Sequence, residues 1–242
     1  MKLFGSFVTE LALPNSAIDV IVMTKEPINT KNAIKKLSKY LIEQDAIMEN
    51  EEVVSGGINV LKVIEKKARI GVNVYFNFAE GYNSMETIKM ALEEYPQLIY
   101  LLLSIKAYLK ERMLNSTEKG GVGSFLLMVM IIGYLQCQLK LAKLQSMNLG
   151  ELFIGFFEFY GSKFNHEILG ISIIGKGRFY KREGETKGIS VENPLNPKVD
   201  LGDPVRCYND VVKSLQYGYD ILKYNNGSLT ELIHSYAGRK LT

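Results

Sequence analysis

Cysteine and histidine are scarce in this chain of 242 residues. It has two cysteines, Cys137 and Cys207, and two histidines, His166 and His234, which lie far apart in the sequence. Such a set provides neither a disulfide framework nor the closely spaced cysteine and histidine pairs of a zinc site. We therefore expect a reducing, intracellular compartment and no histidine-rich metal centre.

Long hydrophobic runs and a strong excess of one charge are also missing. The apolar runs at residues 98–103 and 125–135 are shorter than the roughly 20 residues that a membrane-spanning helix needs, so we interpret both as buried helices. A net charge of only +3 is not typical of a nucleic-acid binder, although it is compatible with a local basic patch. Because Met1 leads directly into a Gly-Ser turn, no secretory signal is visible, and we expect no membrane partner.

The first third of the chain predicts strands and one helix. Continuous β-branched residues and apolar–polar alternation indicate strands that share one sheet. The predicted strands are residues 2–4, 19–23, 58–65 and 70–76. Residues 30–44 place apolar side chains on one side and lysines elsewhere, which predicts an amphipathic helix that packs on the sheet. Asn29 or Thr30 is the expected N-cap of this helix.

After residue 83 the pattern changes to helices. The predicted helices are residues 84–94, 96–113, 124–138, 149–163, 208–224 and 228–238. Between them, residues 170–181 predict a hairpin and residues 182–204 an irregular loop. Ser84 is the expected N-cap of the first of these helices. We therefore expect an α+β protein with a strand-bearing domain at residues 1–83 and a helical domain at residues 84–242.

Five motifs follow one another along the chain. They are Phe-Gly-Ser at 4–6 leading to Ala-Ile-Asp at 17–19, Lys-Ala-Tyr-Leu-Lys at 106–110, Gly-Gly-Val-Gly-Ser-Phe at 120–125, Leu-Gly-Glu-Leu at 149–152 with Phe-Phe-Glu-Phe-Tyr-Gly at 156–161, and Val-Glu-Asn-Pro at 191–194. In this order they resemble the motifs of the TRAMP-type noncanonical poly(A) RNA polymerases. These are terminal nucleotidyltransferases of the DNA polymerase beta superfamily. Each motif alone is a weak signal, but together they indicate the fold and the ancestry.

The resemblance implies a palm domain and a family reaction. The palm, a mixed sheet with helices, would occupy residues 1–83, and a helical central or PAP-associated domain residues 84–242. The family reaction is the magnesium- or manganese-dependent addition of nucleotides from ATP to RNA 3′ ends in nuclear RNA surveillance. Implied partners are RNA, ATP, a zinc-knuckle protein and a helicase, and the implied location is the nucleus. Since the family places helices before the first strand, we interpret the chain as a trimmed gene product or an abbreviated protein.

The resemblance places the three metal-binding aspartates of the family at Ala17, Asp19 and Asn73. Mg²⁺ prefers hard oxygen ligands such as carboxylates, so alanine offers no ligand and asparagine only a neutral carbonyl. Asp19 alone remains as a catalytic and metal-binding carboxylate. We therefore expect the reaction to be slowed on the order of a thousandfold or more, and magnesium or manganese to be held weakly. The change at Ala17 is compatible with engineered inactivation, but Asn73 favours natural divergence.

The nucleotide-binding positions implied by the resemblance are better preserved. They are Gly5, Ser6, Lys106, Lys110, Ser124 and Phe125. The alternatives are an ordinary turn for the first two, a solvated helix face for the lysines, an N-cap for the serine and a core position for the phenylalanine. The base-recognition loop is less well preserved. The family reads Asn-Asp-Val-Gly-Arg where residues 199–203 read Val-Asp-Leu-Gly-Asp, and Asn193 replaces an aspartate.

Three functions are open at this point. The first is a pseudoenzyme that binds nucleotide, RNA or a protein partner. The second is an active RNA nucleotidyltransferase that uses Asp19 with a substitute metal ligand, for which Glu10 and Glu80 are the nearby carboxylates. The third is a degenerating gene product without an independent role. We favour the first because the departures concentrate at chemistry and nucleotide recognition, whereas the apolar core positions persist.

Overall fold

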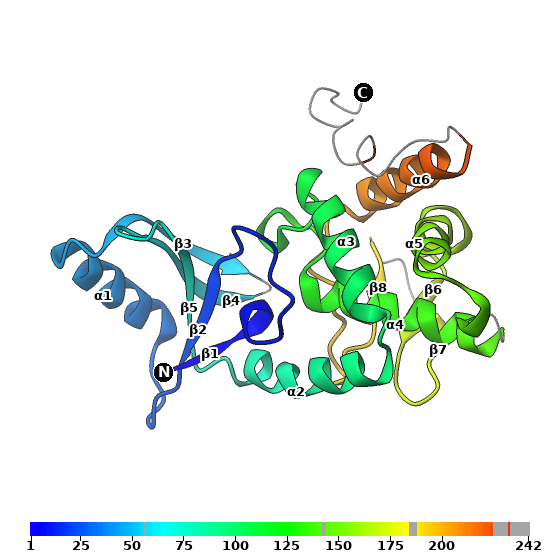
Figure 1. Cartoon of the computed structure of the whole chain (residues 1–242). Coiled ribbons are helices and arrows are strands. Elements are labelled where there is room, and N and C mark those ends of the chain that lie inside the picture. Colours follow the sequence, from blue (N-terminus) through cyan, green and yellow to red (C-terminus); the bar gives the residue numbers. More distant parts are fainter. Residues whose placement is uncertain (56, 142–143, 184–187, 225–231, 233–242) are drawn as a thin grey trace. The chain divides into compact units, whose positions relative to one another are not determined.

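The computed structural model describes residues 1–242 except for 56, 142–143, 184–187, 225–231 and 233–242. The chain folds into two compact units, Met1–Glu93 and Glu94–Thr242, and each contains a sheet of its own (Figure 1). The predicted helix at residues 228–238 lies outside the described residues, apart from Leu232. The functional division of the chain at residue 83 stays a prediction. Among the helices of the described ranges, none is both long and apolar enough to cross a membrane.

The first unit is built on a five-stranded sheet with the order β1-β2-β5-β4-β3 (Figure 1). The strands are β1 (Lys2–Phe4), β2 (Ile18–Val22), β3 (Ile47–Ser55), β4 (Ile58–Glu65) and β5 (Gly71–Phe76). Strands β2 and β5 pair in parallel, and the other neighbours are antiparallel. The prediction that four of these strands share one sheet is confirmed. Strand β3 was not predicted, because its sequence Ile-Met-Glu-Asn-Glu-Glu-Val-Val-Ser lacks regular alternation.

Helix α1 (Thr30–Glu43) packs on one face of this sheet, as predicted (Figure 1). Its residue Ile34 belongs to a core cluster with Leu61, Val63 and Val74 from the strands beneath it. Burying an aliphatic side chain of this size contributes roughly 1.5–3 kcal/mol, so the cluster fixes the helix on the sheet. The Asn29 side chain accepts a hydrogen bond from the Asn32 backbone N–H at 3.0 Å, which makes Asn29 the N-cap.

Helix α2 (Ala79–Glu94) begins five residues before its predicted start. Ser84 is not its N-cap, as the sequence suggested, but lies inside the helix, where its hydroxyl donates to the Gly81 carbonyl at 2.8 Å. A serine that bonds back to a preceding carbonyl looks like a cap in sequence, because both patterns place a serine before an apolar run.

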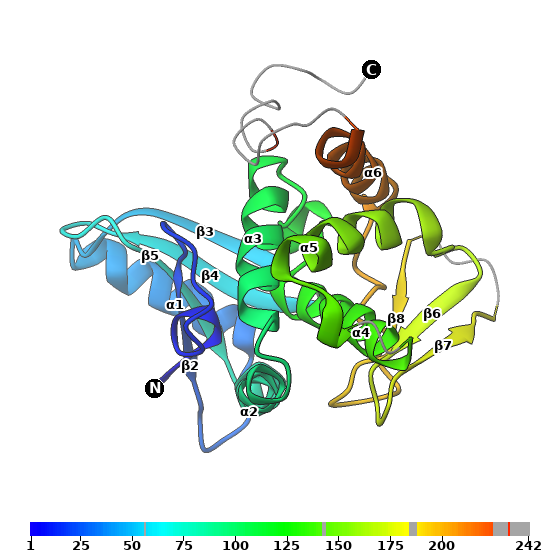
Figure 2. The same cartoon turned by 45° about the vertical axis from the view of Figure 1, so that its right-hand side comes forward.

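The second unit is mainly helical (Figure 2). Its helices are α3 (Leu98–Glu111), α4 (Ser124–Lys140), α5 (Leu149–Glu158), which continues as a π-helix (Phe159–Lys163), and α6 (Tyr208–Tyr224). Helix α4 is buried continuously from Leu126 to Gln136, so the prediction that it is the central helix is confirmed. Short 3₁₀ turns occur at Gly5–Phe7 in the first unit and at Thr117–Lys119 and Leu144–Ser146 in the second.

A three-stranded sheet with the order β7-β6-β8 completes the second unit. Strands β6 (Leu169–Ser172) and β7 (Arg178–Lys181) form the predicted antiparallel hairpin. Strand β8 (Ser190–Val191) pairs with β6 in parallel and lies in a segment that was predicted to be irregular. Two residues are too short for a sequence pattern, so only the pairing with β6 reveals this strand.

Candidate functional site

Asp19 and Asn73 occupy paired positions on the parallel strands β2 and β5. Both side chains are half-buried, and the Asn73 Nδ2 donates a hydrogen bond to Asp19 Oδ1 at 2.9 Å. The neighbouring residue Val74 packs under α1, so Asp19 and Asn73 lie on the opposite face of the sheet. The expected placement of both side chains on one face is therefore observed.

The Gly-Ser turn contacts this pair. Gly5 has φ +73°, and a Cβ atom at this position would lie 2.5 Å from Asp19 Oδ2. Its carbonyl accepts hydrogen bonds from the backbone N–H groups of Val8 and Thr9 at 3.2 Å, which closes the turn. Glycine is therefore required here for both its backbone conformation and its close approach to the carboxylate. Ser6 follows in the same turn and is half-buried.

The side chains at this site do not supply the ligands that a pair of magnesium ions needs. Ala17 supplies a methyl group, which lies 3.3 Å from the position that a Gly71 Cβ would take. The Asn73 amide donates to Asp19 instead of adding a second carboxylate beside it. In the described part of the chain, no three His, Cys, Asp or Glu side chains lie close enough to hold a metal ion, so Glu10 and Glu80 do not complete a set with Asp19. Mg²⁺ usually binds through one or two carboxylates for each ion.

Lys62 is a further polar residue on this face that the sequence analysis did not single out. It pairs with Asn73 across strands β4 and β5, so its side chain extends from the same face as those of Asp19 and Asn73. It is half-buried, and it is flanked in β4 by Leu61 and Val63. A lysine in the middle of the apolar stretch Val60–Ile64 is the sequence signal that could have found it.

In the second unit, the two predicted nucleotide-binding lysines differ in exposure. Lys106 is only 8% exposed, whereas Lys110, one turn later on α3, is half-buried. The alternative of a solvated helix face is therefore wrong for Lys106. Burying a lysine is costly unless its charge is compensated, so this position is more constrained than its place on an amphipathic helix suggested.

Ser124 and Phe125 begin helix α4. The N-cap is Gly123, with φ −67° and ψ 160°, and Ser124 is the first helical residue. The prediction that Ser124 is the N-cap is therefore wrong, because glycine also caps helices and here precedes the serine. Ser124 is exposed and Phe125 is half-buried, so neither belongs to the buried core of the helix.

The loop at residues 199–203 keeps its internal framework. The Asp200 carboxylate accepts hydrogen bonds from the backbone N–H groups of Val191 and Gly202 at 2.8 and 2.7 Å and from the Ser190 hydroxyl at 2.6 Å. A Cβ atom on Gly202 would lie 1.9 Å from the Ile189 carbonyl oxygen. Asp200 and Gly202 match the family pattern described above, and they are the residues that shape the loop.

Two departures from that pattern are at exposed positions, and the change at Asn193 is at a buried one. Val199 is 39% exposed and Asp203 is also exposed, where the family pattern has asparagine and arginine. Asn193 is buried at 5% exposure, and its side chain accepts a hydrogen bond from the Leu195 N–H at 2.9 Å. The changed loop thus retains its hydrogen-bonded framework and no longer presents the asparagine amide and the arginine guanidinium.

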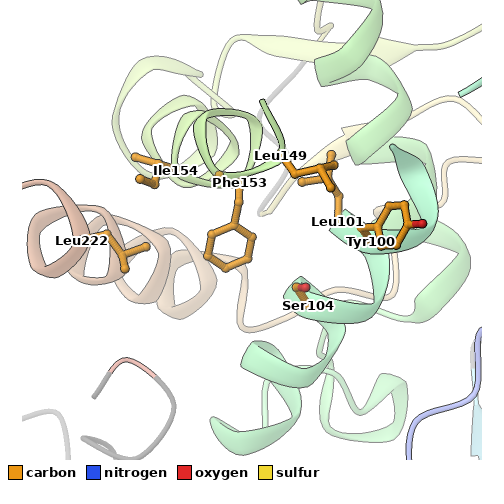
Figure 3. Close-up of a pocket in the computed structure, with 8 residues that line it drawn as sticks. Tyr100, Leu101, Ser104, Leu149, Phe153, Ile154 and Leu222 are labelled. Carbon is orange, nitrogen blue, oxygen red and sulfur yellow. The ribbon is translucent and has the colours of Figure 1, made fainter. Parts of the chain in front are cut away.

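An apolar pocket of about 330 Å³ lies between helices α3, α5 and α6 (Figure 3). Its lining residues are Tyr100, Leu101, Ser104, Leu149, Gly150, Phe153, Ile154 and Leu222. Figure 3 shows the Phe153 ring extending into the space between the three helices. The predicted nucleotide-binding residues are not in this lining. Sequence reasoning missed the pocket because three helices that are distant in sequence form it.

Two family models match the chain. A nucleotidyltransferase domain model matches residues 1–74, and a model of the Cid1 family of poly(A) polymerases matches residues 148–198. The first match contains the Gly-Ser turn and the Asp19–Asn73 pair. The second contains helix α5, the small sheet and the start of the following loop.

Curated relatives match along most of the chain. Poly(A) RNA polymerase protein 1 of Saccharomyces cerevisiae is 32% identical over 235 residues, which cover 92% of this chain and 37% of the yeast protein. Trf4-2 of Drosophila melanogaster, whose name describes an inactive poly(A) RNA polymerase, is 32% identical over 224 residues, 90% of this chain and 54% of the fly protein. The chain thus spans only part of the length of these relatives.

Solved structures share the fold. The polymerase core of TRAMP, described as an RNA surveillance complex, aligns with a TM-score of 0.83 at 22% identity, over 96% of this chain and 75% of that one. The Cid1 poly(U) polymerase with MgGTP bound aligns with a TM-score of 0.74 at 18% identity, over 96% of this chain and 85% of that one. The mixed sheet with helices and the second helical unit are therefore a nucleotidyltransferase fold with a PAP-associated part, as the sequence predicted.

Proposed function

The chain belongs to the family of poly(A) RNA polymerases, and from this premise we propose that it is a catalytically impaired member that binds nucleotide, RNA or a protein partner. The observation that carries the proposal is the hydrogen bond from the Asn73 amide to the only remaining carboxylate, Asp19. At the remaining one of the three aspartate positions, Ala17 offers only a methyl group. One carboxylate and one amide donor cannot replace three carboxylates.

The consequence for catalysis follows from the charge that nucleotidyl transfer requires. Metal ions neutralise the triphosphate and lower the pKa of the attacking hydroxyl, which is worth several kcal/mol of barrier. At about 1.4 kcal/mol for each tenfold in rate, the loss of this stabilisation predicts a rate lower on the order of a thousandfold or more. Lys106 and Lys110 can screen phosphate charge but cannot activate a hydroxyl group.

Several features support retained binding. The Gly5 turn keeps its close approach to Asp19, and the loop at 199–203 keeps its hydrogen-bonded framework around Asp200. Lys62 adds a positive charge to the face of the sheet that carries Asp19 and Asn73. We therefore propose that Gly5, Ser6, Lys106, Lys110, Ser124 and Phe125 retain contacts with nucleotide.

The cellular role is proposed from the relatives. The polymerase core of TRAMP belongs to a complex described as an RNA surveillance complex. We propose that this chain acts in nuclear RNA surveillance, where it binds RNA together with a zinc-knuckle protein or a helicase. Residues 1–83 would act as the palm, and residues 84–242 as the helical domain.

Primer extension with ATP and Mg²⁺ tests the proposal. The unmodified chain should extend an oligoadenylate primer at a barely measurable rate. The double substitution Ala17→Asp, Asn73→Asp should recover activity, and either single substitution should recover much less, because metal ligands act as one unit. Ala17→Asn with Asn73→Asp is the matched control, since it fills the same space with one carboxylate fewer.

Robust extension by the unmodified chain that is abolished by Asp19→Ala would overturn the proposal. That result would favour the active nucleotidyltransferase with a substitute ligand such as Glu10 or Glu80. ATP binding gives an independent measurement: it should be weak and insensitive to EDTA. It should decrease in Lys106→Met, which keeps the buried side-chain volume, and stay unchanged in the exposed control Lys89→Met.

A further inference from the structure

The outward face of helix α1 carries a row of lysines. Lys31, Lys35 and Lys39 follow one another at intervals of four residues, so they form one ridge, and Lys36 lies on the neighbouring ridge. All four are exposed, because the opposite side of the helix packs on the sheet through Ile34 (Figure 1). The net charge of the whole chain is only +3, so it does not reveal that four lysines are clustered on one side of α1.

The described structure shows one ion pair with this row. The one carboxylate on the helix, Glu43, lies 3.8 Å from the Lys39 Nζ, in a pair whose side chains are 58% and 80% exposed. Such exposed pairs contribute little. Within the described residues, Lys31, Lys35 and Lys36 form no ion pair. The face is therefore open to an external polyanion.

An exposed aromatic residue lies on the neighbouring ridge, beside Lys36. Tyr40 is 58% exposed and follows Lys36 by four residues, so the two side chains are neighbours on the helix surface. Aromatic side chains beside cations are the combination that binds single-stranded nucleic acids, because bases stack on the ring while the cations contact the backbone. An acidic protein surface would use the lysines but gain nothing specific from stacking on Tyr40.

The geometry of the row suits an extended strand. A step of four helical residues is about 6 Å along the axis, so three lysines present charges over about 12 Å. This spacing is comparable to that of successive phosphates in an extended single strand. The helix is held rigid by its core contacts, so the charges are already arranged before a ligand binds.

We propose that α1 is a second RNA-contacting surface, in which Lys31, Lys35 and Lys39 bind the backbone of single-stranded RNA and Tyr40 stacks with a base. This surface lies on the face of the sheet opposite Asp19 and Asn73, so it is separate from the candidate nucleotide site. The choice of RNA as the polyanion rests on the proposed function. The surface would hold the body of an RNA and would not recognise its 3′ end.

The test is binding of a fluorescent single-stranded oligoadenylate with a 3′-phosphate, measured by anisotropy over a range of salt concentrations. The blocked end removes any contribution from 3′-end recognition. The triple substitution of Lys31, Lys35 and Lys39 by Gln should raise the Kd about tenfold or more at low salt. It should also reduce the slope of log Kd against log salt by about 2, since each phosphate contact contributes about 0.7. The same three lysines changed to Arg should retain binding.

Two controls separate a built surface from bulk charge and from simple unfolding. Substituting Lys89, Lys176 and Lys213 by Gln changes the net charge equally at exposed positions elsewhere, and it should shift the Kd much less. Tyr40→Ala should weaken binding about fivefold to tenfold, and Tyr40→Phe should not, because stacking is kept. Equal losses in the two lysine triples, or equal binding by Tyr40→Ala and Tyr40→Phe, would overturn the proposal.

Three further outcomes identify which proposal fails. If polyglutamate displaces the RNA and binds with the same dependence on Tyr40, the surface is a site for acidic proteins and the RNA proposal is wrong. If the unmodified chain binds oligoadenylate but the Gln triple at α1 binds equally well, the α1 proposal fails while the proposed function stands. If the unmodified chain extends RNA efficiently, the proposed catalytic impairment is wrong. The effect of the α1 substitutions on RNA binding still tests the α1 proposal in that case.

Discussion

At the scale of single residues, Gly5 links the backbone of the first turn to the candidate site. Its φ of +73° favours glycine, and an added Cβ would lie 2.5 Å from the Asp19 carboxylate. Gly175 in the second unit has a similar φ of +66°, but there an added Cβ would meet nothing within 4 Å. Comparing alanine substitutions at the two glycines therefore separates two contributions to the free energy of unfolding: the unfavourable backbone conformation and the steric clash with Asp19.

We predict that Gly5→Ala destabilises the chain more than Gly175→Ala. The control should lose about 1 kcal/mol through its left-handed conformation alone, whereas Gly5→Ala should lose about 1–3 kcal/mol further because Asp19 must move. Urea unfolding, followed by circular dichroism, measures both. Equal losses would mean that the turn at Gly5 relaxes away from Asp19 without cost.

Asn73 is the second residue at which local chemistry can be tested. Asn73→Asp replaces a hydrogen-bond donor to Asp19 by a second carboxylate, so like charges face each other without a metal ion. We predict a loss of about 1–3 kcal/mol at neutral pH in EDTA. Mg²⁺ should reverse part of this loss in the variant and leave the unmodified chain unchanged. Thermal unfolding with and without Mg²⁺ measures this. If Mg²⁺ does not change the stability of Asn73→Asp, the assignment of Asp19 and Asn73 to a metal-binding position is wrong.

At the scale of elements, Glu158 connects the end of α5 to its neighbours. Its carboxylate accepts hydrogen bonds from Lys163 Nζ in the π-helix at 2.7 Å and from the Tyr219 hydroxyl on α6 at 2.9 Å. The bond from Lys163, aided by the bond from Tyr219, lowers the pKa of Glu158 below its ordinary value of 4.5. The unfolded chain therefore binds more protons here than the folded chain.

The stabilisation by Glu158 should consequently depend on pH. It is present above the unfolded pKa of about 4.5 and is lost as the pH falls through the lower folded pKa. We predict that Glu158→Gln lowers stability at pH 7 by about 1 kcal/mol or less, because the pair is partly exposed, and that it has little effect near pH 3. Urea unfolding at the two pH values measures this, with the exposed Glu167→Gln as the control. A constant difference between pH 7 and pH 3 would show that the carboxylate charge is not responsible.

At the scale of the whole molecule, each compact unit has its own buried core. Leu61 belongs to the core beneath α1 in the first unit, and Leu135 lies on the buried helix α4 of the second; both have 0% exposure. Removing a buried leucine side chain to alanine typically costs 2–5 kcal/mol. Cores that do not share residues can lose stability separately.

We predict that Leu61→Ala reduces hydrogen-exchange protection across strands β2, β4 and β5 and leaves α4 protected. Leu135→Ala, the matched substitution, should do the reverse. Hydrogen exchange followed by mass spectrometry of peptides resolves the two units. Loss of protection throughout the chain in either variant would mean that the units unfold as one cooperative body.

Local sequence patterns alone determined much of this protein. The hairpin at residues 170–181, the uninterrupted apolar helix α4 and the boundaries of α6 follow from turn residues, hydropathy and periodicity, which act within a few residues. The identities of Ala17 and Asn73 also belong to the sequence, since an alanine offers no metal ligand in any fold. The family motifs then related these residues to one site.

The tertiary structure alone decided how distant residues meet and which side chains are buried. Parallel pairing of β2 with β5 brings Asp19 within hydrogen-bond distance of Asn73, 54 residues later, and the hydrogen bonds between strands have no local signature in the sequence. The acidic edge strand β3 and the two-residue strand β8 exist because neighbouring strands pair with them. Lys106 looked like a surface residue, but packing around α3 leaves it 8% exposed. Burial and strand pairing depend on neighbours that are distant in the chain, and a local pattern cannot specify them.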